Sequence, residues 1–273
     1  MTDSGTFASF EKSPYRSVKV STYFDTYDHL FAKYRGKPIT FVEIGIFGGG
    51  SLFMWRDYFG PEARIIGIDF NPNAKKWEKD GFEIFIGNQS DEGFWENFVK
   101  EIGPVDVVLD DGGHTYEQQI ITVESLLANM KDGGTLAVED THTSYMNRYG
   151  RKKYSFLNYV KQYLDRINLR FGSLDKTKAD DRVWSIQVFE SLVAFHIDRA
   201  ASRRKSELID NSAEHDDAQD YRFADDSSAD ALLQRADRLK WLKAIPGVRK
   251  LGAGIVNAAS GRKNASRLKR YFD

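Results

Sequence analysis

Short apolar runs alternate along this chain with longer segments whose apolar residues recur every three or four positions. The first long segment, residues 19–34, has aromatic and leucine side chains at that spacing, which predicts an amphipathic helix. Five runs rich in β-branched residues predict strands at 39–46, 64–69, 82–86, 105–110 and 135–139. The remaining periodic segments predict helices at 52–59, 91–101, 116–130 and 154–169. This alternation predicts an α/β fold with a mostly parallel, doubly wound sheet.

Two further apolar runs, residues 183–189 and 192–197, are separated only by Glu190 and Ser191. So short a connection forces the two strands into an antiparallel hairpin. The sheet is therefore predicted to have seven strands, with the last strand antiparallel to the others.

Changes in composition divide the chain into four parts. They are an N-terminal arm at 1–18, an α/β domain at 19–200, an acidic linker at 201–234 and a basic amphipathic tail at 235–273. The arm is polar with little periodicity, which predicts a loose segment. The tail is interpreted either as a helix that docks on a membrane surface or partner protein, or as a solvated or packed helix.

Charge and composition narrow the classes of function. The formal net charge of −1 gives no reason to expect a nucleic-acid partner. The chain has no cysteine, so any metal must bind through oxygen or imidazole ligands. No apolar run approaches the roughly 20 residues of a membrane span, and the N-terminus lacks a signal-peptide pattern. A cytoplasmic protein is predicted, with peripheral attachment to the inner membrane through the tail as one option.

A glycine-rich turn, Glu43-x-Gly45-x-x-Gly48-Gly49, follows the first predicted strand, and Ser51 closes it before the next helix. Glycine lets the backbone come close to a ligand, and a helix N-terminus offers that ligand free N–H groups. Asp69 ends the next strand, where a carboxylate can accept hydrogen bonds from the hydroxyls of a ribose. These residues predict a nucleotide-type cofactor site, although a tight turn followed by an unrelated acid would look the same.

Dinucleotides and S-adenosylmethionine both bind at turns of this kind. Three features favour S-adenosylmethionine. The glycines do not follow the G-x-G-x-x-G pattern, the C-terminal hairpin suits the methyltransferase variant of the sheet, and Glu43 would repel a pyrophosphate but could face a cationic methionyl group. Asn88 and Gln89 follow the third strand, where their amides can hydrogen-bond the edge of an adenine or simply form a turn.

Two predicted strands end in acids followed by a histidine, in Asp110-Asp111-Gly-Gly-His114 and Glu139-Asp140-Thr-His142. Carboxylates that converge from neighbouring strand ends repel one another unless a cation lies between them. Mg²⁺ takes oxygen ligands and leaves room for a substrate, so the candidate ligands are Asp111, Glu139 and Asp140. His114 is a candidate general base for an acceptor hydroxyl. Asp110 is assigned to the methionyl end of the cofactor or to support of the turn. The alternative is that each acidic pair only caps a helix or lines a loop.

The polar aromatic loop 141–153 is predicted to bind the acceptor, with His142 and Tyr145 as candidate contacts. For His142, a substrate contact, a partner of the metal ligands and an ordinary loop histidine all stay open.

Together these motifs resemble the metal-dependent class I methyltransferases that act on sugar hydroxyls, of the macrocin, mycinose-pathway and rhamnosyl types. The resemblance covers roughly residues 20–197 and rests on the segments 41–56, 66–69, 87–91, 110–114 and 139–142. It implies a Rossmann-like class I methyltransferase sheet and a homo-oligomer. The site that it implies has His114 as the base, Mg²⁺ held by Asp111, Glu139 and Asp140, and S-adenosylmethionine lined by Glu43, Gly45, Asp69 and Gln89.

We therefore predict an S-adenosylmethionine- and Mg²⁺-dependent O-methyltransferase. Its acceptor is predicted to be a deoxysugar or other glycosyl hydroxyl in a glycosylated natural product, a surface polysaccharide or a glycolipid. The alternatives are an NAD-dependent oxidoreductase on the same type of sheet, and a non-catalytic module that docks on a membrane or a partner.

Overall fold

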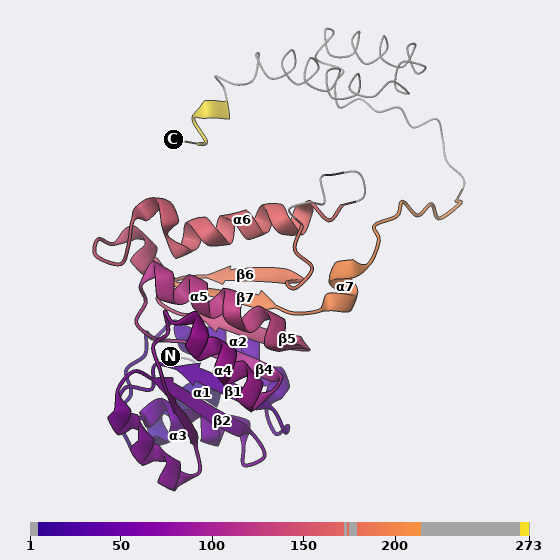
Figure 1. Cartoon of the computed structure of the whole chain (residues 1–273). Helices are drawn as coiled ribbons and strands as arrows, with labels where there is room; N and C mark the ends of the chain where they lie inside the picture. Colours follow the sequence, from indigo (N-terminus) through magenta and orange to yellow (C-terminus); the bar gives the residue numbers. More distant parts are fainter. Residues whose placement is uncertain (1–4, 172–173, 175–178, 214–267, 273) are drawn as a thin grey trace, which may run out of the picture. The chain divides into compact units, whose positions relative to one another are not determined.

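The computed structural model describes residues 5–171, 174, 179–213 and 268–272 (Figure 1). The chain divides into two units, residues 1–207 and 208–273. Most of the predicted acidic linker and basic tail lies outside the described residues, so docking through the tail stays a prediction. Within the described part of the chain, no helix is long and apolar enough to cross a membrane.

One seven-stranded sheet forms the centre of the first unit, in the order β3-β2-β1-β4-β5-β7-β6. Its strands are β1 (Thr40–Ile44), β2 (Arg64–Asp69), β3 (Glu83–Ile86), β4 (Val105–Asp110), β5 (Met130–Val138), β6 (Ser185–Phe189) and β7 (Leu192–His196). The first five strands pair in parallel, whereas β7 runs antiparallel to both of its neighbours, β5 and β6. The predicted α/β sheet with an antiparallel last strand is confirmed.

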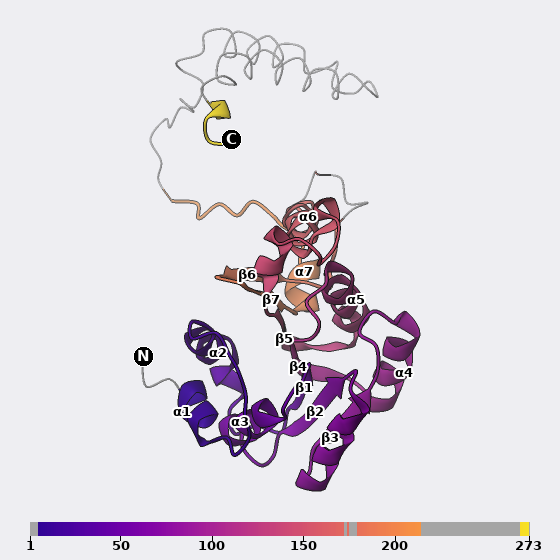
Figure 2. The ribbon, with the colours of Figure 1, turned by 90° about the vertical axis from the view of Figure 1, so that its left-hand side faces the viewer.

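Helices cover both faces of this sheet (Figure 2). The α-helices are α1 (Gly5–Lys12), α2 (Tyr23–Phe31), α3 (Gly50–Phe59), α4 (Glu92–Ile102), α5 (Tyr116–Leu126), α6 (Phe156–Asn168) and α7 (Arg199–Arg203). Short 3-10 helices are η1 (Ala32–Tyr34), η2 (Pro72–Asp80), η3 (Leu127–Asn129), η4 (Thr141–Tyr145) and η5 (Lys152–Tyr154). The apolar sides of α2 and α3 pack on one face, and those of α4, α5 and α6 pack on the other. The sheet is thus doubly wound.

The N-terminal segment differs from its prediction. The sequence predicts a loose arm, but residues 5–12 form helix α1, so this prediction is wrong for them. Phe7 and Phe10 pack on Phe24 of α2, each with 5.1 Å between ring centroids. The hydroxyl of Ser9 donates to Asp57 of α3 over 2.7 Å. A helix of eight residues carries too few apolar positions for its period to stand out in the sequence.

The carboxyl ends of β1, β4 and β5 meet at one edge of the sheet. Ile44 pairs with Asp110, and Asp110 pairs with Val138, so the residues after these strands become neighbours. The loop between β4 and α5 is short: β4 ends at Asp110, and Thr115 already caps α5 in a capping box with Gln118. The strand end and the helix cap therefore fix residues 111–114 from both sides.

The half-buried side chain of His196 in β7 should make stability depend on pH. Burial, together with Lys33 and His29, lowers the pKa of His196 from 6.5 to about 4. Between pH 6.5 and pH 4, His196 is protonated in the unfolded chain but largely neutral in the folded chain. The free energy of unfolding therefore falls as the pH drops through this range. Glutamine does not titrate, so we expect His196→Gln to lose roughly 1–2 kcal/mol less unfolding free energy than the wild type over this pH range. This figure is reduced because the side chain is partly exposed and solvent screens its charge. Urea unfolding of both proteins across this pH range measures the difference; parallel pH profiles would contradict it.

Candidate active site

The glycine turn connects β1 to α3 and packs against the residues that follow β4. Gly45 has a φ of +83°, and a Cβ atom there would lie 2.1 Å from the carbonyl oxygen of Asp111. Only glycine allows both this conformation and this approach. The backbone N–H groups of Ile46 and Phe47 donate to Asp69 Oδ2 over 3.1 and 3.2 Å. The predicted turn and the predicted strand-end acid are therefore held against one another.

A cleft of about 760 Å³ lies over this edge of the sheet. The predicted residues that line it are Gly45, Gly48, Ser51, Asp69, Asn88, Gln89, Asp111, His114 and Asp140. Three predicted residues, Glu43, Asp110 and Glu139, are buried beneath it. The structure therefore gathers the predicted cofactor and metal residues around one cleft and separates those that face it from those that support it.

Asp110 and Gln89 form a buried network under the loop after β4. The amide nitrogen of Gln89 donates to Asp110 Oδ1 over 2.6 Å, and its carbonyl oxygen accepts from the backbone N–H of Gly113 over 3.1 Å. The N–H of Gly112 donates to the same oxygen of Asp110. Burial raises the pKa of Asp110 to about 7. Both side chains thus hold the loop that carries Asp111 and His114, which matches the supporting role considered for Asp110.

Glu43 lies beneath the glycine turn. Its carboxylate accepts from the hydroxyl of Ser51 over 2.7 Å and from the indole nitrogen of Trp55 over 3.1 Å. Burial raises the pKa of Glu43 to about 7, although Lys19 and Ser51 act in the opposite direction. The carboxylate therefore fixes the start of α3 against the end of β1, and it is buried and does not line the cleft.

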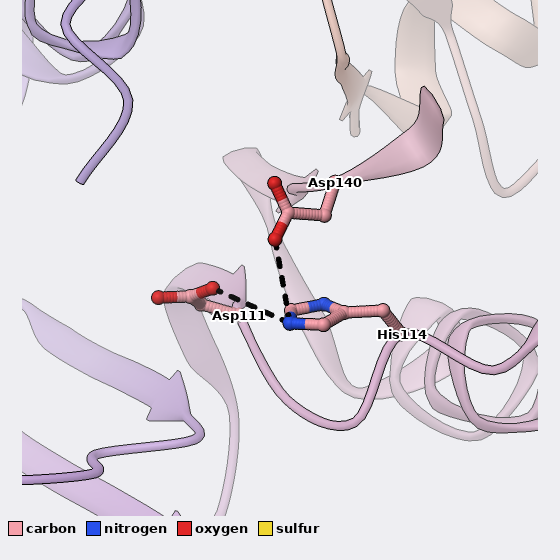
Figure 3. Close-up of side chains that lie close together, drawn as sticks. All are labelled: Asp111, His114 and Asp140. Carbon is pink, nitrogen blue, oxygen red and sulfur yellow. Dashed lines mark ion pairs between the residues drawn. The ribbon is translucent and has the colours of Figure 1, made fainter. Parts of the chain in front are cut away.

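The side chains of Asp111, His114 and Asp140 lie close together, as Figure 3 shows, and all three line the cleft. The Nε2 atom of His114 lies 3.3 Å from Asp140 Oδ2 and 4.0 Å from Asp111 Oδ1. One ligand atom from each residue lies within 4.8 Å of the others. Oxygen and imidazole donors at this spacing fit a divalent cation. His114 and Asp140 both have positive φ values, 58° and 53°, which is uncommon outside glycine and concentrates at functional sites.

Glu139 is buried and, unlike these three residues, does not line the cleft. Its carboxylate accepts from the hydroxyl of Tyr27 and lies 3.3 Å from the ammonium of Lys19, and its side chain is only 1% exposed. Burial raises the pKa of Glu139, while Lys19 opposes the rise. Two donor sets that share Asp111 and Asp140 can be compared. Among the described residues, only the set with His114 has its ligand atoms within 4.8 Å of one another; the other set, with Glu139, is the one that the sequence predicts.

The sequence interpretation missed three hydrogen-bond donors that precede β1 in the chain. Lys19, Tyr23 and Tyr27 are spaced four residues apart, and each reaches one or more of the acids. Lys19 lies 2.7 Å from Asp111 Oδ2, and the hydroxyl of Tyr23 donates to Asp140 Oδ1 over 2.7 Å. For the two tyrosines the signal is their four-residue spacing, which fits apolar packing on a buried helix face equally well; Lys19 lies before the start of α2 and carries no such signal.

The two candidate acceptor residues line a second, smaller cavity of about 420 Å³. His142 bonds through Nδ1 to the hydroxyl of Ser191, whose backbone carbonyl accepts from the N–H of Thr141. Tyr145 is 74% exposed. Val20 and Val188 add apolar surface to the same cavity. It therefore offers both polar and apolar contacts beside the acidic cluster.

Part of the chain is similar to known methyltransferases. Residues 42–141 match the model of a methyltransferase domain family. A rhamnosyl-tetracenomycin-C 3'-O-methyltransferase of Streptomyces olivaceus is 38% identical over 131 residues, which are 45% of this chain and 33% of that protein. The demethylmacrocin O-methyltransferase of Streptomyces fradiae is 28% identical over 183 residues, 61% of this chain and 46% of that protein. The chain spans less than half the length of these curated relatives.

The solved structures agree on the fold. The mycinamycin-pathway methyltransferase MycE, in complex with Mg, SAH and mycinamycin VI, has a TM-score of 0.64 and 23% identity. The alignment covers 78% of this chain and 57% of MycE. Nothing in these matches supports an oxidoreductase or a non-catalytic docking module. Residues 42–141 thus match a methyltransferase domain, the chain shares the fold of MycE, and part of it is similar to sugar O-methyltransferases.

Proposed function

We propose that this protein transfers a methyl group from S-adenosylmethionine to a hydroxyl of a glycosyl acceptor, with the help of Mg²⁺. The observation that carries the proposal is that His114, Asp111 and Asp140 lie close together and line one cleft with the glycine turn and Asp69. A base and a cation site at the edge of a nucleotide-type cleft suit proton removal beside a bound methyl donor.

The residues around the cleft fit these ligands. Asp69 and Asn88 lie where they can bind the ribose and adenine of S-adenosylmethionine, and the turn at Gly45 and Gly48 brings backbone close to its methionyl part. When bound, S-adenosylmethionine supplies the methyl group and Mg²⁺ polarises the acceptor hydroxyl. His114 removes the proton of that hydroxyl, and Asp140 Oδ2, 3.3 Å away, stabilises the imidazolium that forms.

Of the two donor sets we favour Asp111, Glu139 and Asp140. Mg²⁺ prefers oxygen ligands, and this set leaves the Nε2 atom of His114 free to accept a proton. A histidine bound to the metal through that atom could not act as a base. Tyr23 and Tyr27 hydrogen-bond Asp140 and Glu139 and so orient both carboxylates.

The acceptor is proposed to be a deoxysugar on a glycosylated natural product, as in the names of the relatives. The cavity around His142 and Tyr145 adjoins Asp140, so a sugar whose hydroxyl faces His114 can extend into it. The aromatic ring of Tyr145 is largely exposed, so it provides a flat face against which the sugar or its apolar aglycone can pack.

Two measurements test the proposal. We expect S-adenosylhomocysteine to raise the melting temperature, because it fills the cleft, and NADH to leave it unchanged. We expect labelled methyl groups to pass from S-adenosylmethionine to a rhamnosyl glycoside. Stabilisation by NADH instead of S-adenosylhomocysteine would refute the methyltransferase assignment. Methylation only of acceptors without a sugar would refute the proposed acceptor class.

A further inference from the structure

Residues 13–19, here called the strap, run along one side of the cofactor cleft. The hydroxyl of Ser13 donates to the carbonyl of Gly50 over 2.7 Å. The carbonyl oxygen of Arg16 lies 2.9 Å from where a Cβ atom on Gly48 would be. The side of the cleft formed by the strap consists of Arg16, Ser17 and Val18. The strap is thus a wall of the predicted cofactor site.

Lys19 is the buried end of this otherwise largely exposed strap. Its side chain is 1% exposed, and its ammonium lies 2.7 Å from Asp111 Oδ2, 3.3 Å from both carboxylate oxygens of Glu139 and 3.9 Å from Glu43 Oε1. The ring of Tyr27 lies 5.7 Å away. This single positive charge therefore sits among three carboxylates and ties the strap to them.

The carboxylates that bind Lys19 are also proposed metal ligands. A divalent cation that takes Glu139 must use an oxygen that the ammonium now contacts, and at Asp111 it binds the same carboxylate whose Oδ2 atom the ammonium contacts. Two cations that share the same buried oxygens repel one another strongly, since the interior screens charge poorly. Lys19 and the metal ion therefore cannot both keep close contact with Asp111 and Glu139.

We propose that Lys19 is a positioning residue that acts as a tethered counter-cation. Without a metal ion, the ammonium of Lys19 holds Asp111 and Glu139 in place and fixes the strap along its side of the cleft. When a divalent cation binds these carboxylates, it displaces the ammonium, and the strap is no longer held. This inference rests on the proposed metal site. It links occupation of that site to the wall of the cofactor cleft.

The first test compares the affinity for Mn²⁺ alone, measured by electron paramagnetic resonance, in wild type and in Lys19→Met. We expect the variant to bind Mn²⁺ more tightly, by about tenfold, because the competing charge is gone, and the buried Glu43 and Glu139 and the partly exposed Asp111 then need another partner. Lys12→Met is the matched control: Lys12 lies close by in the sequence, and its ion pair with Asp57 is exposed. Equal or weaker binding by folded Lys19→Met would overturn the proposal, since a purely structural lysine could only weaken the site when removed.

The second test needs no variant. Hydrogen exchange of residues 13–19 in the wild-type protein should speed up when Mn²⁺ is added. If Mn²⁺ binds but the exchange of the strap does not change, Lys19 is not displaced and the proposal is wrong. If neither wild type nor Lys19→Met binds Mn²⁺, the proposed metal site fails together with this inference. Equal binding by both proteins overturns only the inference.

Discussion

Asp111→Asn should abolish turnover while the protein stays folded. Asp111 belongs to both donor sets, and its carboxylate faces Lys19 on one side and His114 on the other. The amide of asparagine keeps the shape of the side chain but loses the negative charge that a divalent cation requires. Because metal stabilisation of a developing negative charge is worth several kcal/mol, we expect the rate to fall by about 10³-fold or more.

The measurement pairs methyl-transfer rates with Mn²⁺ affinity and thermal unfolding. Wild-type protein dialysed against EDTA should lose activity to a similar degree and recover it with Mg²⁺. The matched control is Asp91→Asn, since Asp91 caps α4 through its side chain and asparagine caps a helix equally well. Full activity of the wild type in EDTA, or an Asp111→Asn rate close to that of the wild type, would contradict the metal role.

Much of this site follows from the sequence because strand ends are local features. An apolar run that ends in acids and a histidine predicts both the strand and the edge at which its last residues lie. Parallel pairing then brings the segments after β1, β4 and β5 together without further information. Asp111, His114 and Asp140 could therefore be predicted as neighbours. That they line one cleft with Asp69 was predictable for the same reason.

The supporting residues were harder to predict because their partners are far away in the sequence. Lys19 is separated from Asp111 by 92 residues and from Glu139 by 120. Nothing near Lys19 in the sequence marks it as buried, and lysine is rarely buried without a partner. The direction of each carboxylate was equally hidden: Glu139 turns inwards to Tyr27, and its neighbour Asp140 turns to the cleft. Both acids follow the last residue of β5, and Asp140 has a left-handed backbone, so the sequence alone does not show which way each side chain points.

His114→Ala should lower kcat by about 10²–10⁴-fold, the usual contribution of a positioned general base. His114 lines the cleft, and its Nε2 atom lies beside Asp111 and Asp140, where an acceptor hydroxyl must lie for His114 to remove its proton. If the metal ion is held by Asp111, Glu139 and Asp140, its affinity should stay near the wild-type value. Binding of S-adenosylhomocysteine should also stay, since the glycine turn and Asp69 are untouched. Steady-state kinetics, Mn²⁺ binding and calorimetry with S-adenosylhomocysteine separate these effects.

The same variant distinguishes the two donor sets. If His114 is a ligand rather than the base, Mn²⁺ affinity falls together with kcat, whereas Glu139→Gln then leaves that affinity unchanged. If His114 is the base, the pattern reverses: His114→Ala keeps the metal and Glu139→Gln loses it. His196→Gln is the control for loss of an imidazole, because His196 bonds Thr135 and Gln187 and does not line the cleft. A His114→Ala enzyme with a near-wild-type rate would remove this residue from the mechanism, and the base would have to be sought among the other groups around Asp140.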